Sequence, residues 1–480
     1  MKRITRRSMM SGMAAGAALA LSPKAGRAQQ RIVMNDASRL SPTPVFRHWI
    51  VKPDPEAELI AAFRKELKDA AGEKRPVCIS AARHSMGGQS LPRNGVAITM
   101  DIDRCEPDRK AMTFRVNGGT RWHQVIAHLD RIGMSPAVMQ SNSDFGVAAT
   151  FSVNAHGWPT PYGPFGSTVR SFRIMLADGS ILTCSRAENP ELFGFVMGGY
   201  GLFGIILDLD VDMVENRMMQ PHPEIMPAED FAARFIKAAN DPAIRMIYGR
   251  LNVTRGDFFE EAKLVSYAIA PTPKDGLPPV RRVGAFPFLS REIYRAQVGS
   301  ERAKAARWFA EKRASGGAAT RNTLMNEPAV NLENRDRRRT DILHEYFVAP
   351  ERFNDFIEGC RRIIPKSKSE FLNVTLRHVL KDDTSVLSFA ATNRIAAVMS
   401  FSQEITPEGE ADMIVTTEAL IDHVRAIGGS YYLPYRLHAR PDQFSSIYPN
   451  AARFAERKRH YDPGLLFRNA LWDTYLASIA

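Results

Sequence analysis

A turn rich in small residues, 79–90, follows a short apolar run at 76–80 and is the first segment suited to a ligand site. Small side chains leave the backbone uncovered, so its N–H groups can approach a phosphate closely. Arg83 supplies a positive charge in the same turn. The turn matches neither GxGxxG nor GxxxxGKS/T, so nicotinamide-binding and P-loop functions lack support. An ordinary structural turn is the open alternative.

Two further segments combine small residues with polar side chains. Residues 141–157 are rich in Ser, Gly, Ala and Asn, a composition that suits a long polar ligand lying against the backbone. Residues 198–204 contain four glycines and precede an apolar strand at 205–214, which indicates a tight backbone path beside a ligand or another strand. His156 either contacts a ligand here or satisfies a hydrogen bond in the core.

These three segments, in this order and spacing, resemble the FAD-binding domain of the vanillyl-alcohol oxidase and p-cresol methylhydroxylase (PCMH-type) family. The sequence YDPGLLFRN at 461–469 resembles the family's closing YDPxxxFxN pattern. The resemblance covers residues 41–214 and the C-terminal segment, and it implies that FAD is the cofactor. Residues 373–388 resemble a pattern of the alditol and sugar-lactone oxidases, and residues 428–436 one of the decaprenylphosphoryl-ribose oxidases.

The resemblance also implies which residues bind FAD. The turn that begins at Ile79 would hold the pyrophosphate, and Ile206 would contact the cofactor through its backbone. His84 stands where many members attach the flavin covalently, so a covalent and a non-covalent cofactor are both open. A second link would need a cysteine within 141–157, which has none. The implied set is Ile79, Ser80, Ala81, Ala82, Arg83, His84, Ser85, Ser141, Gly146, Ala149, Val153, Asn154, Ala155, His156, Ile206 and Asn469.

Three residues are the candidates for catalysis. Oxidation of a C–H bond by FAD needs a group that takes the hydroxyl proton and a positive charge that stabilises the reduced, anionic flavin. Arg377, Tyr435 and Arg436 could supply both functions. Each could instead be a salt-bridged strand residue or a packed tyrosine. Thr375 stands where the sugar-lactone oxidases have an acidic residue, which is a departure from the family pattern.

The elements that position these residues follow from hydrophobic periodicity. Helices are predicted at 53–71, 121–131, 301–315 and 407–426. Strands are predicted at 76–80, 96–102, 111–116, 169–176, 181–184, 205–214, 246–253, 263–268, 341–347, 369–376, 396–401 and 431–435. With the resemblance, this order predicts an α+β fold: a two-subdomain PCMH-type FAD-binding domain and a substrate (cap) domain with an antiparallel sheet flanked by helices. The predicted divisions are a signal peptide at 1–28, the FAD-binding domain at 41–214, the cap at 215–445 and a segment at 446–480 that returns to the FAD-binding domain.

The charge of the chain is uneven. Lys and Arg exceed Asp and Glu by 64 to 52, a formal net charge of +12, and half of this excess lies in residues 1–30. There Arg6 and Arg7 precede a moderately apolar stretch and a small-x-small pattern at 26–28, which predicts a cleaved twin-arginine signal. An anchored or irrelevant N-terminus is the alternative. The expected location is the periplasm or the exterior, with no integral membrane span.

Nucleic-acid and metal partners are not expected. The basic run 335–339 has no interleaved aromatic residues, so it does not predict nucleic-acid binding. The four cysteines are far apart and form no CxxC pair, so neither a metal site nor a disulfide framework is predicted.

Together these features predict an exported FAD-dependent oxidoreductase that oxidises a hydroxylated substrate: an alcohol, polyol, sugar or lactone. Hydride transfer to flavin N5 would be followed by reoxidation by O2, as in an oxidase, or by a periplasmic electron acceptor, as in a dehydrogenase. An enzyme of the same family that acts on an amine or a phenol, or an oxidative cyclase, is the nearest alternative. A non-catalytic exported binding protein is the alternative from a different class.

Overall fold

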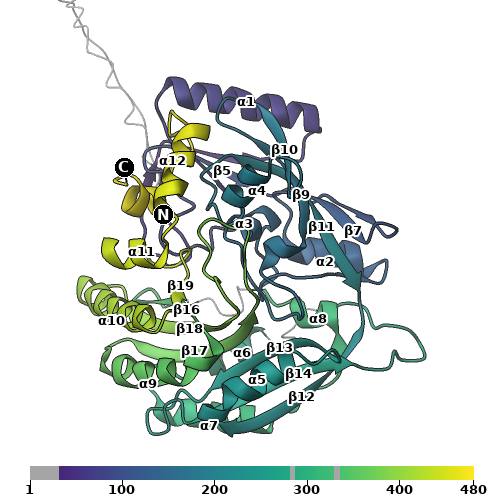
Figure 1. The fold of residues 1–480 in the computed structure, drawn as a ribbon, viewed down its shortest axis with the longest axis vertical. Helices are drawn as coiled ribbons and strands as arrows, with labels where there is room; N and C mark the ends of the chain where they lie inside the picture. The colour runs from purple at the N-terminus through teal and green to yellow at the C-terminus, as the bar shows by residue number, and fades with distance from the viewer. Residues whose placement is uncertain (1–31, 282–286, 329–333, 335, 480) are drawn as a thin grey trace, which may run out of the picture. The chain divides into compact units, whose positions relative to one another are not determined.

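The structure is a computed structural model, which describes residues 32–281, 287–328, 334 and 336–479 (Figure 1). The predicted signal peptide, residues 1–28, lies outside these described residues. From Ile32 onward the chain forms one compact unit. Within that unit, the predicted division at 214 falls at the end of the strand Ile205–Glu215, and the one at 445 falls inside the helix Pro441–Ile447. The fold class is α+β, as predicted, with three larger sheets and helices that pack on them.

The first sheet is parallel and leads directly into the predicted FAD turn. Its strand order is β3-β5-β4. Helix α1 covers it, because Leu59, Phe63 and Leu67 recur every four residues and all three are buried in the same core as the strands. The elements are β3 Arg47–Val51, α1 Glu56–Gly72, β4 Val77–Ser80 and β5 Val96–Met100.

The second sheet is antiparallel and completes the FAD-binding region. Its order is β10-β9-β11-β7-β6, and β8 also pairs with β11. The strands predicted at 169–176 and 181–184 form a hairpin: β9 and β10 are joined through Gly179, whose φ of 80° is the left-handed conformation that such a turn requires. The elements are β6 Cys105–Asp108, β7 Thr113–Asn117, α2 Trp122–Asp130, β8 Met134–Pro136, α3 Val147–Ser152, β9 Val169–Met175, β10 Ile181–Ser185, α4 Pro190–Val196 and β11 Ile205–Glu215, with a separate small hairpin β1 Ile32–Met34 and β2 Thr43–Val45.

The third sheet has eight strands in the order β15-β12-β14-β13-β17-β18-β16-β19. The strand pairings described within it are antiparallel, as predicted for the cap. The strands are β12 Met218–Pro227, β13 Ile244–Leu251, β14 Glu261–Ile269, β15 Ala319–Thr320, β16 Arg339–Val348, β17 Glu370–Val379, β18 Arg394–Glu404 and β19 Ser430–Tyr431.

Helices cover one face of this sheet, and Figure 1 shows α9 and α10 beside β16, β17 and β18. Phe231 of α5 lies against Gly249 of β13, so closely that a Cβ at this glycine would stand 2.2 Å from the ring. On β16, His344 faces Thr417 of α10. The helices are α5 Phe231–Ala239, α6 Pro287–Arg295, α7 Glu301–Arg313, α8 Arg321–Met325, α9 Phe353–Ile363 and α10 Pro407–Ala426. Of these, α6 and α7 contact the other face: the Tyr294 hydroxyl of α6 bonds to Ser400 Oγ of β18 at 2.8 Å, and Arg307 of α7 donates to Asn373 Oδ1 of β17 at 3.1 Å.

The C-terminal segment returns to the first sheet. After α11 Pro441–Ile447 and α12 Ala451–Tyr461, the Leu466 carbonyl accepts a hydrogen bond of 2.7 Å from the Val77 N–H at the start of β4. The Asp462 carboxylate fixes this turn by accepting the backbone N–H groups of Leu466 and Phe467 at 2.9 and 2.8 Å. The tail thus lies beside the strand that carries the FAD turn.

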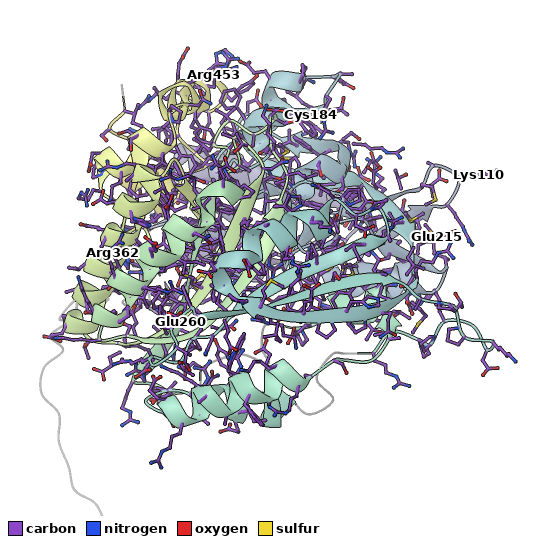
Figure 2. The ribbon with its side chains drawn as sticks, turned by 60° about the horizontal axis from the view of Figure 1, so that its bottom comes forward. Lys110, Cys184, Glu215, Glu260, Arg362 and Arg453 are labelled. Atoms are coloured by element: carbon purple, nitrogen blue, oxygen red, sulfur yellow. The ribbon has the colours of Figure 1, made fainter. Side chains whose placement is uncertain are left out.

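Charged side chains such as Lys110, Glu215 and Arg362 lie at the periphery in Figure 2. Cys184, labelled in the same view, is by contrast fully buried. No helix within the described ranges combines the length and apolar character needed to cross a bilayer. In the same part of the chain, no cluster of three or more His, Cys, Asp or Glu side chains could hold a metal ion.

Candidate active site

A cavity of about 960 Å³ lies between the predicted FAD segments and the open face of the eight-stranded sheet. On the sheet side its lining residues alternate along the strands, because successive side chains of a strand point to opposite faces. Leu343 and Glu345 of β16 line the cavity, whereas His344 between them contacts α10. Thr375 and Arg377 of β17 repeat the pattern. The alternation therefore gives the sheet one face for the core and one for a ligand.

Most of the residues predicted to bind FAD meet in this cavity. Two do not: Asn154 and Asn469 are outside its lining. Asn154 donates to Asp382 at 2.9 Å and accepts from the Gly166 N–H at 2.9 Å, and Asn469 donates to the Tyr200 carbonyl at 2.9 Å. Both are structural in this geometry. The predicted residues that line the cavity are Ile79, Ser80, Ala81, Ala82, Arg83, His84, Ser85, Ser141, Gly146, Ala149, Val153, Ala155, His156 and Ile206.

The turn after β4 has the backbone that a phosphate needs. Arg83 has a φ of 54°, the left-handed conformation that favours glycine. Its Nη1 donates to Thr99 Oγ1 at 3.1 Å, which holds the guanidinium beside the turn. Within the described chain, the backbone N–H groups of Ala82, Arg83 and Ser85 donate no hydrogen bond. They remain available to the oxygens of a ligand.

Two close approaches shape the cavity beside this turn. A Cβ on Gly146 would stand 2.5 Å from the Ala81 Cβ, so the two segments meet only because both residues are small. The His84 ring stacks on Phe145 with 4.4 Å between the ring centroids, and both residues line the cavity. The free N–H groups, the cationic turn and the large cavity fit a dinucleotide whose pyrophosphate is bound by the turn.

Glu345 is a buried acidic residue in the wall of the cavity. It is only 3% exposed, and its carboxylate has two protein partners. One oxygen is hydrogen-bonded to Nε2 of His156, and the other accepts from the hydroxyl of Tyr435 at 3.1 Å. The Nδ1 atom of His156 is buried and has no partner among the described residues. A buried carboxylate held in this way is suited to accept a proton from a substrate hydroxyl.

Tyr435 acts on this carboxylate as a donor. Burial, together with the neighbouring Glu345, raises the pKa of Tyr435 well above its usual range. The tyrosine therefore keeps its proton at physiological pH and donates it in the hydrogen bond.

Arg377 joins the two sides of the cavity. Its Nη2 donates to Ser141 Oγ, in the second predicted FAD segment. Burial lowers the pKa of Arg377, while the negative charge of Glu345 opposes the shift. Its Nε is buried without a hydrogen-bond partner in the described structure. Arg377 thus brings a desolvated positive charge to the wall of the cavity.

Arg436, the third catalytic candidate, does not line the cavity. Its guanidinium pairs with Glu410 on α10 and donates to Ser41 Oγ at 2.9 Å and to the Met86 carbonyl at 3.2 Å. These contacts join α10 to the end of the FAD turn. We therefore assign Arg436 a structural role and remove it from the catalytic set.

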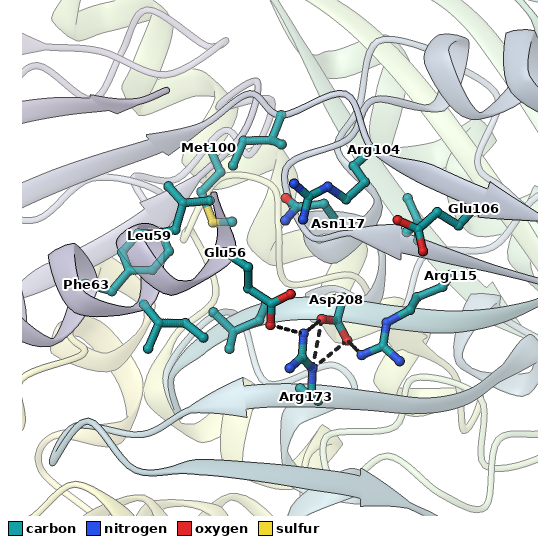
Figure 3. A pocket seen from close by; sticks show the side chains of 14 residues that line it. Glu56, Leu59, Phe63, Met100, Arg104, Glu106, Arg115, Asn117, Arg173 and Asp208 are labelled. Carbon is teal, nitrogen blue, oxygen red and sulfur yellow. Dashed lines mark hydrogen bonds and ion pairs between the residues drawn. The ribbon is translucent and has the colours of Figure 1, made fainter. Parts of the chain in front are cut away.

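A second cavity, of about 90 Å³, is not a candidate site (Figure 3). Four of its charged groups are paired with one another: Arg173 bonds to Glu56 at 2.8 Å and also to Asp208, which in turn accepts from Arg115 at 2.8 Å. These contacts raise the pKa of Arg173, which means that they stabilise its charge. The cluster ties α1 to the second sheet.

Comparisons with known proteins agree with this geometry. A family described as an FAD binding domain matches residues 49–185. Cytokinin dehydrogenase 1 of Arabidopsis thaliana is 34% identical over 128 residues, which cover 26% of this chain and 22% of that protein. Cytokinin dehydrogenase 2 of the same plant is 29% identical over 206 residues, 41% of each chain. D-arabinono-1,4-lactone oxidase of Yarrowia lipolytica is 38% identical over 92 residues, 19% of this chain and 18% of that protein.

These matches confirm the resemblance seen in the sequence: the chain carries an FAD-binding domain of the PCMH type, and its cofactor is FAD. The matched segments span less than half the length of each of these relatives. The activity and the substrate of the whole protein therefore have to be argued from the site.

Sequence reasoning missed Glu345, as well as Arg250, Trp158 and Tyr248, which also line the cavity. The sequence could have indicated Glu345, since it is an acidic residue inside a largely apolar strand. It lies four residues after Asp341, so the two side chains are on the same face of that strand. Trp158 had none, because it reaches the cap through pairing of its own backbone with β13: its carbonyl accepts the Ile247 N–H at 2.8 Å.

Proposed function

We propose that this protein is an FAD-dependent oxidoreductase that oxidises the CH–OH group of a small hydroxylated molecule. The observation that carries the proposal is the buried Glu345 carboxylate, hydrogen-bonded to His156 and Tyr435 in the wall of the cavity that the FAD segments share. FAD, when bound, accepts a hydride from the substrate carbon. The protein must then take the hydroxyl proton, so that a carbonyl product forms.

Each polar group of the site has a role in this scheme. Glu345 accepts the hydroxyl proton, and His156 and Tyr435 hold its two oxygens in a fixed orientation. Arg377 supplies a positive charge from a buried position, where an electrostatic interaction is stronger than in water. The apolar surroundings of His156, which include Phe347 and Phe389 with ring centroids at 5.5 and 6.1 Å, favour exclusion of water.

The proposal extends to export. The support is the basic start with Arg6 and Arg7, followed by a moderately apolar stretch and a small-x-small pattern at 26–28. In that setting, O2 or a periplasmic electron acceptor would reoxidise the flavin. Expression with the native N-terminus should give a periplasmic protein that begins near Gln29. A full-length protein retained in the cytoplasm would contradict this part.

The proposal is tested on the purified protein in two steps. The first is the visible spectrum, which should show one bound flavin per chain. Precipitation with acid then separates the open alternatives, because a covalent bond to His84 leaves the colour in the pellet and a non-covalent flavin goes to the supernatant. The variant His84→Ala should release all of the colour.

The second step is an anaerobic screen for flavin reduction. Alcohols, polyols, sugars, lactones and hydroxy acids are compared with amines and phenols, and at least one hydroxylated compound should bleach the flavin. Reduction by amines alone would favour the second candidate, which matches the relatives that are named cytokinin dehydrogenases. A colourless protein without flavin would overturn the proposal and favour a binding protein.

A further inference from the structure

The sheet side of the cavity carries two arginines on neighbouring strands. Arg250 of β13 is paired in register with Thr375 of β17, and Arg377 follows two residues along the same face. Arg250 Nη1 donates to Thr375 Oγ1 at 2.6 Å. The two guanidinium groups are close enough for the charge of Arg250 to disfavour that of Arg377. The position between them is occupied by a neutral threonine and not by an acid.

These arginines have donors that the protein leaves unused. The Nε atoms of Arg250 and Arg377 are both buried, and neither has a hydrogen-bond acceptor in the described structure. The indole Nε1 of Trp158 is a third buried donor without an acceptor there. All three residues line the same cavity. Guanidinium and indole N–H groups can only donate, so the missing partner must be an acceptor.

Two carboxyl groups of the protein, Glu311 and Glu327, lie near Arg250. Their charges affect whether the missing acceptor is an anion. Glu311 Oε1 is 3.5 Å from the Arg250 Nε, so it forms an ion pair without the geometry of a hydrogen bond. Glu327 also lines the cavity, and burial raises its pKa, although Arg250 opposes the shift. Glu327 therefore gives up its charge more readily than an exposed glutamate. For Arg377, the acidic neighbour among the described residues is Glu345, whose charge favours the ionised arginine.

An aromatic wall adjoins Arg250. The ring centroid of Trp158 lies 5.4 Å from that of Tyr248 and 5.5 Å from that of Tyr267, both in edge-to-face geometry. The guanidinium of Arg250 stands 5.6 Å from the Tyr248 ring. Such a wall packs well against the apolar or planar body of a small molecule.

We infer that the substrate is a hydroxy acid whose carboxylate binds between Arg250 and Arg377, within reach of the Trp158 indole. The inference rests on the proposed function and narrows its substrate class. A carboxylate offers two oxygens in the plane that a guanidinium matches, and it can accept hydrogen bonds from the donors of both arginines that have no acceptor in the protein. The same molecule presents its hydroxyl to Glu345 and its body to the aromatic wall.

The reaction balances without a further co-reactant. The C–H bond of the hydroxyl-bearing carbon gives its hydrogen and electron pair to FAD, and the hydroxyl proton passes to Glu345. The product is the corresponding oxo acid, and its carboxylate keeps its charge throughout. Arg250 and Arg377 therefore bind substrate and product, and they mainly set affinity for the acid.

The test separates binding from turnover. Calorimetry with phenylacetate and with propionate, which carry no hydroxyl group, measures carboxylate binding by the oxidised holoenzyme. Anaerobic flavin reduction compares mandelate and lactate with their methyl esters. We expect the carboxylates to bind and the acids to reduce the flavin at lower concentration than the esters. Arg250→Met and Arg377→Met should each weaken carboxylate binding about 10- to 100-fold, as expected for a lost charged hydrogen bond.

Controls keep the result independent of misfolding. Arg250→Lys keeps the charge but loses the planar fork, so its binding should be intermediate. Arg338→Met removes an arginine that is 89% exposed and should leave binding unchanged. Flavin content and the thermal midpoint confirm that each variant is folded.

The outcomes distinguish this inference from the proposed function. The inference is overturned if neutral alcohols reduce the flavin while the carboxylates neither bind nor reduce it, and the proposed function then stands. Carboxylate binding that is lost in both methionine variants, without reduction by any compound, would support the anion site and count against the oxidoreductase.

Discussion

Glu345, His156 and Tyr435 come from three distant parts of the chain. Their separations in sequence are 189 residues between Glu345 and His156 and 90 between Glu345 and Tyr435. None of these residues indicates a catalytic role by itself, since a lone buried histidine or tyrosine is usually a packing residue. Chemistry arises only because the fold places a carboxylate between them in a cavity. Sequence patterns identified Tyr435 and His156 but not the acid that joins them.

The hydrogen bond from Tyr435 is open to a direct test. In Tyr435→Phe we expect flavin reduction to be about 10- to 100-fold slower, because the hydrogen bond that orients the charged Glu345 contributes about 1.5–3 kcal/mol. Flavin content should be unchanged. Tyr448→Phe is the matched control, since its hydroxyl bonds to the Tyr431 carbonyl outside the cavity. Equal rates in Tyr435→Phe and wild type would contradict the role of Tyr435.

Arg83 combines a backbone strain with a functional charge. Its φ of 54° is costly for a residue with a side chain, so Arg83→Gly should stabilise the apoprotein by up to about 1 kcal/mol. The same change removes the positive charge and should weaken FAD binding. Arg83→Ala loses the charge but keeps the strain, and it should show only the second effect. Chemical denaturation measures the stability of the apoprotein, and titration with FAD measures its affinity for the cofactor. A glycine variant that is less stable than the wild type would contradict the prediction that Arg83 is strained.

At the element scale, most strands of the described chain could be predicted, but of its helices only α1, α2, α7 and α10. β12 was missed because it contains Pro221, Pro223 and Pro227. These prolines alternate, so their missing N–H groups all point away from β14, toward an edge that pairs with β15 only at 218–219. The predicted strand at 431–435 is shorter, Ser430–Tyr431, because Pro434 instead accepts the Met86 N–H of the FAD turn.

The FAD side of the site could be predicted from the sequence, and the sheet side could be predicted only in part. The small-residue segments mark the FAD side, because close approach to a ligand requires particular residue types. The sheet side has no such constraint: Arg250 and Trp158 meet only through register and through backbone pairing with β13. Alternation alone gives two faces and does not say which of them meets a ligand.

The C-terminal turn depends on Asp462. Its carboxylate accepts two backbone N–H groups and pairs with the buried Lys458. Asp462→Ala leaves that lysine buried without its counter-charge, so we expect a loss of about 3–5 kcal/mol in the free energy of unfolding. Asp473→Ala breaks the exposed pair with Arg468 and should cost less than about 1 kcal/mol. Denaturant unfolding that gives equal losses would contradict this role of the tail.

At the scale of the whole molecule, one ionic cluster links the cap to the FAD turn. Glu410 on α10 binds His438 at 2.9 Å and pairs with Arg436, whose other contacts reach Ser41 and the Met86 carbonyl. Burial raises the pKa of Glu410, but the His438 hydrogen bond and the Arg436 charge outweigh it and lower the pKa to about 2. The cluster therefore favours the ionised carboxylate in the folded state.

This shift predicts a pH dependence of stability. Because the folded pKa lies below the ordinary value of 4.5, the contribution of Glu410 is present above pH 4.5 and is lost as the pH falls toward 2. Glu410→Gln should lower the free energy of unfolding at pH 7 by about 1–3 kcal/mol and reduce its loss on acidification. Glu404→Gln, at a carboxylate that is 62% exposed, is the control and should keep the wild-type pH profile. A parallel profile for Glu410→Gln would contradict the prediction.

The most direct test of the account is the rate of anaerobic flavin reduction in Glu345→Gln. This change keeps the size of the side chain and removes the group that accepts the proton. With any substrate that reduces the wild type, we predict reduction that is about 100-fold slower or more, with wild-type flavin content. Reduction at the wild-type rate by a folded, flavin-loaded Glu345→Gln protein would contradict the proposed mechanism.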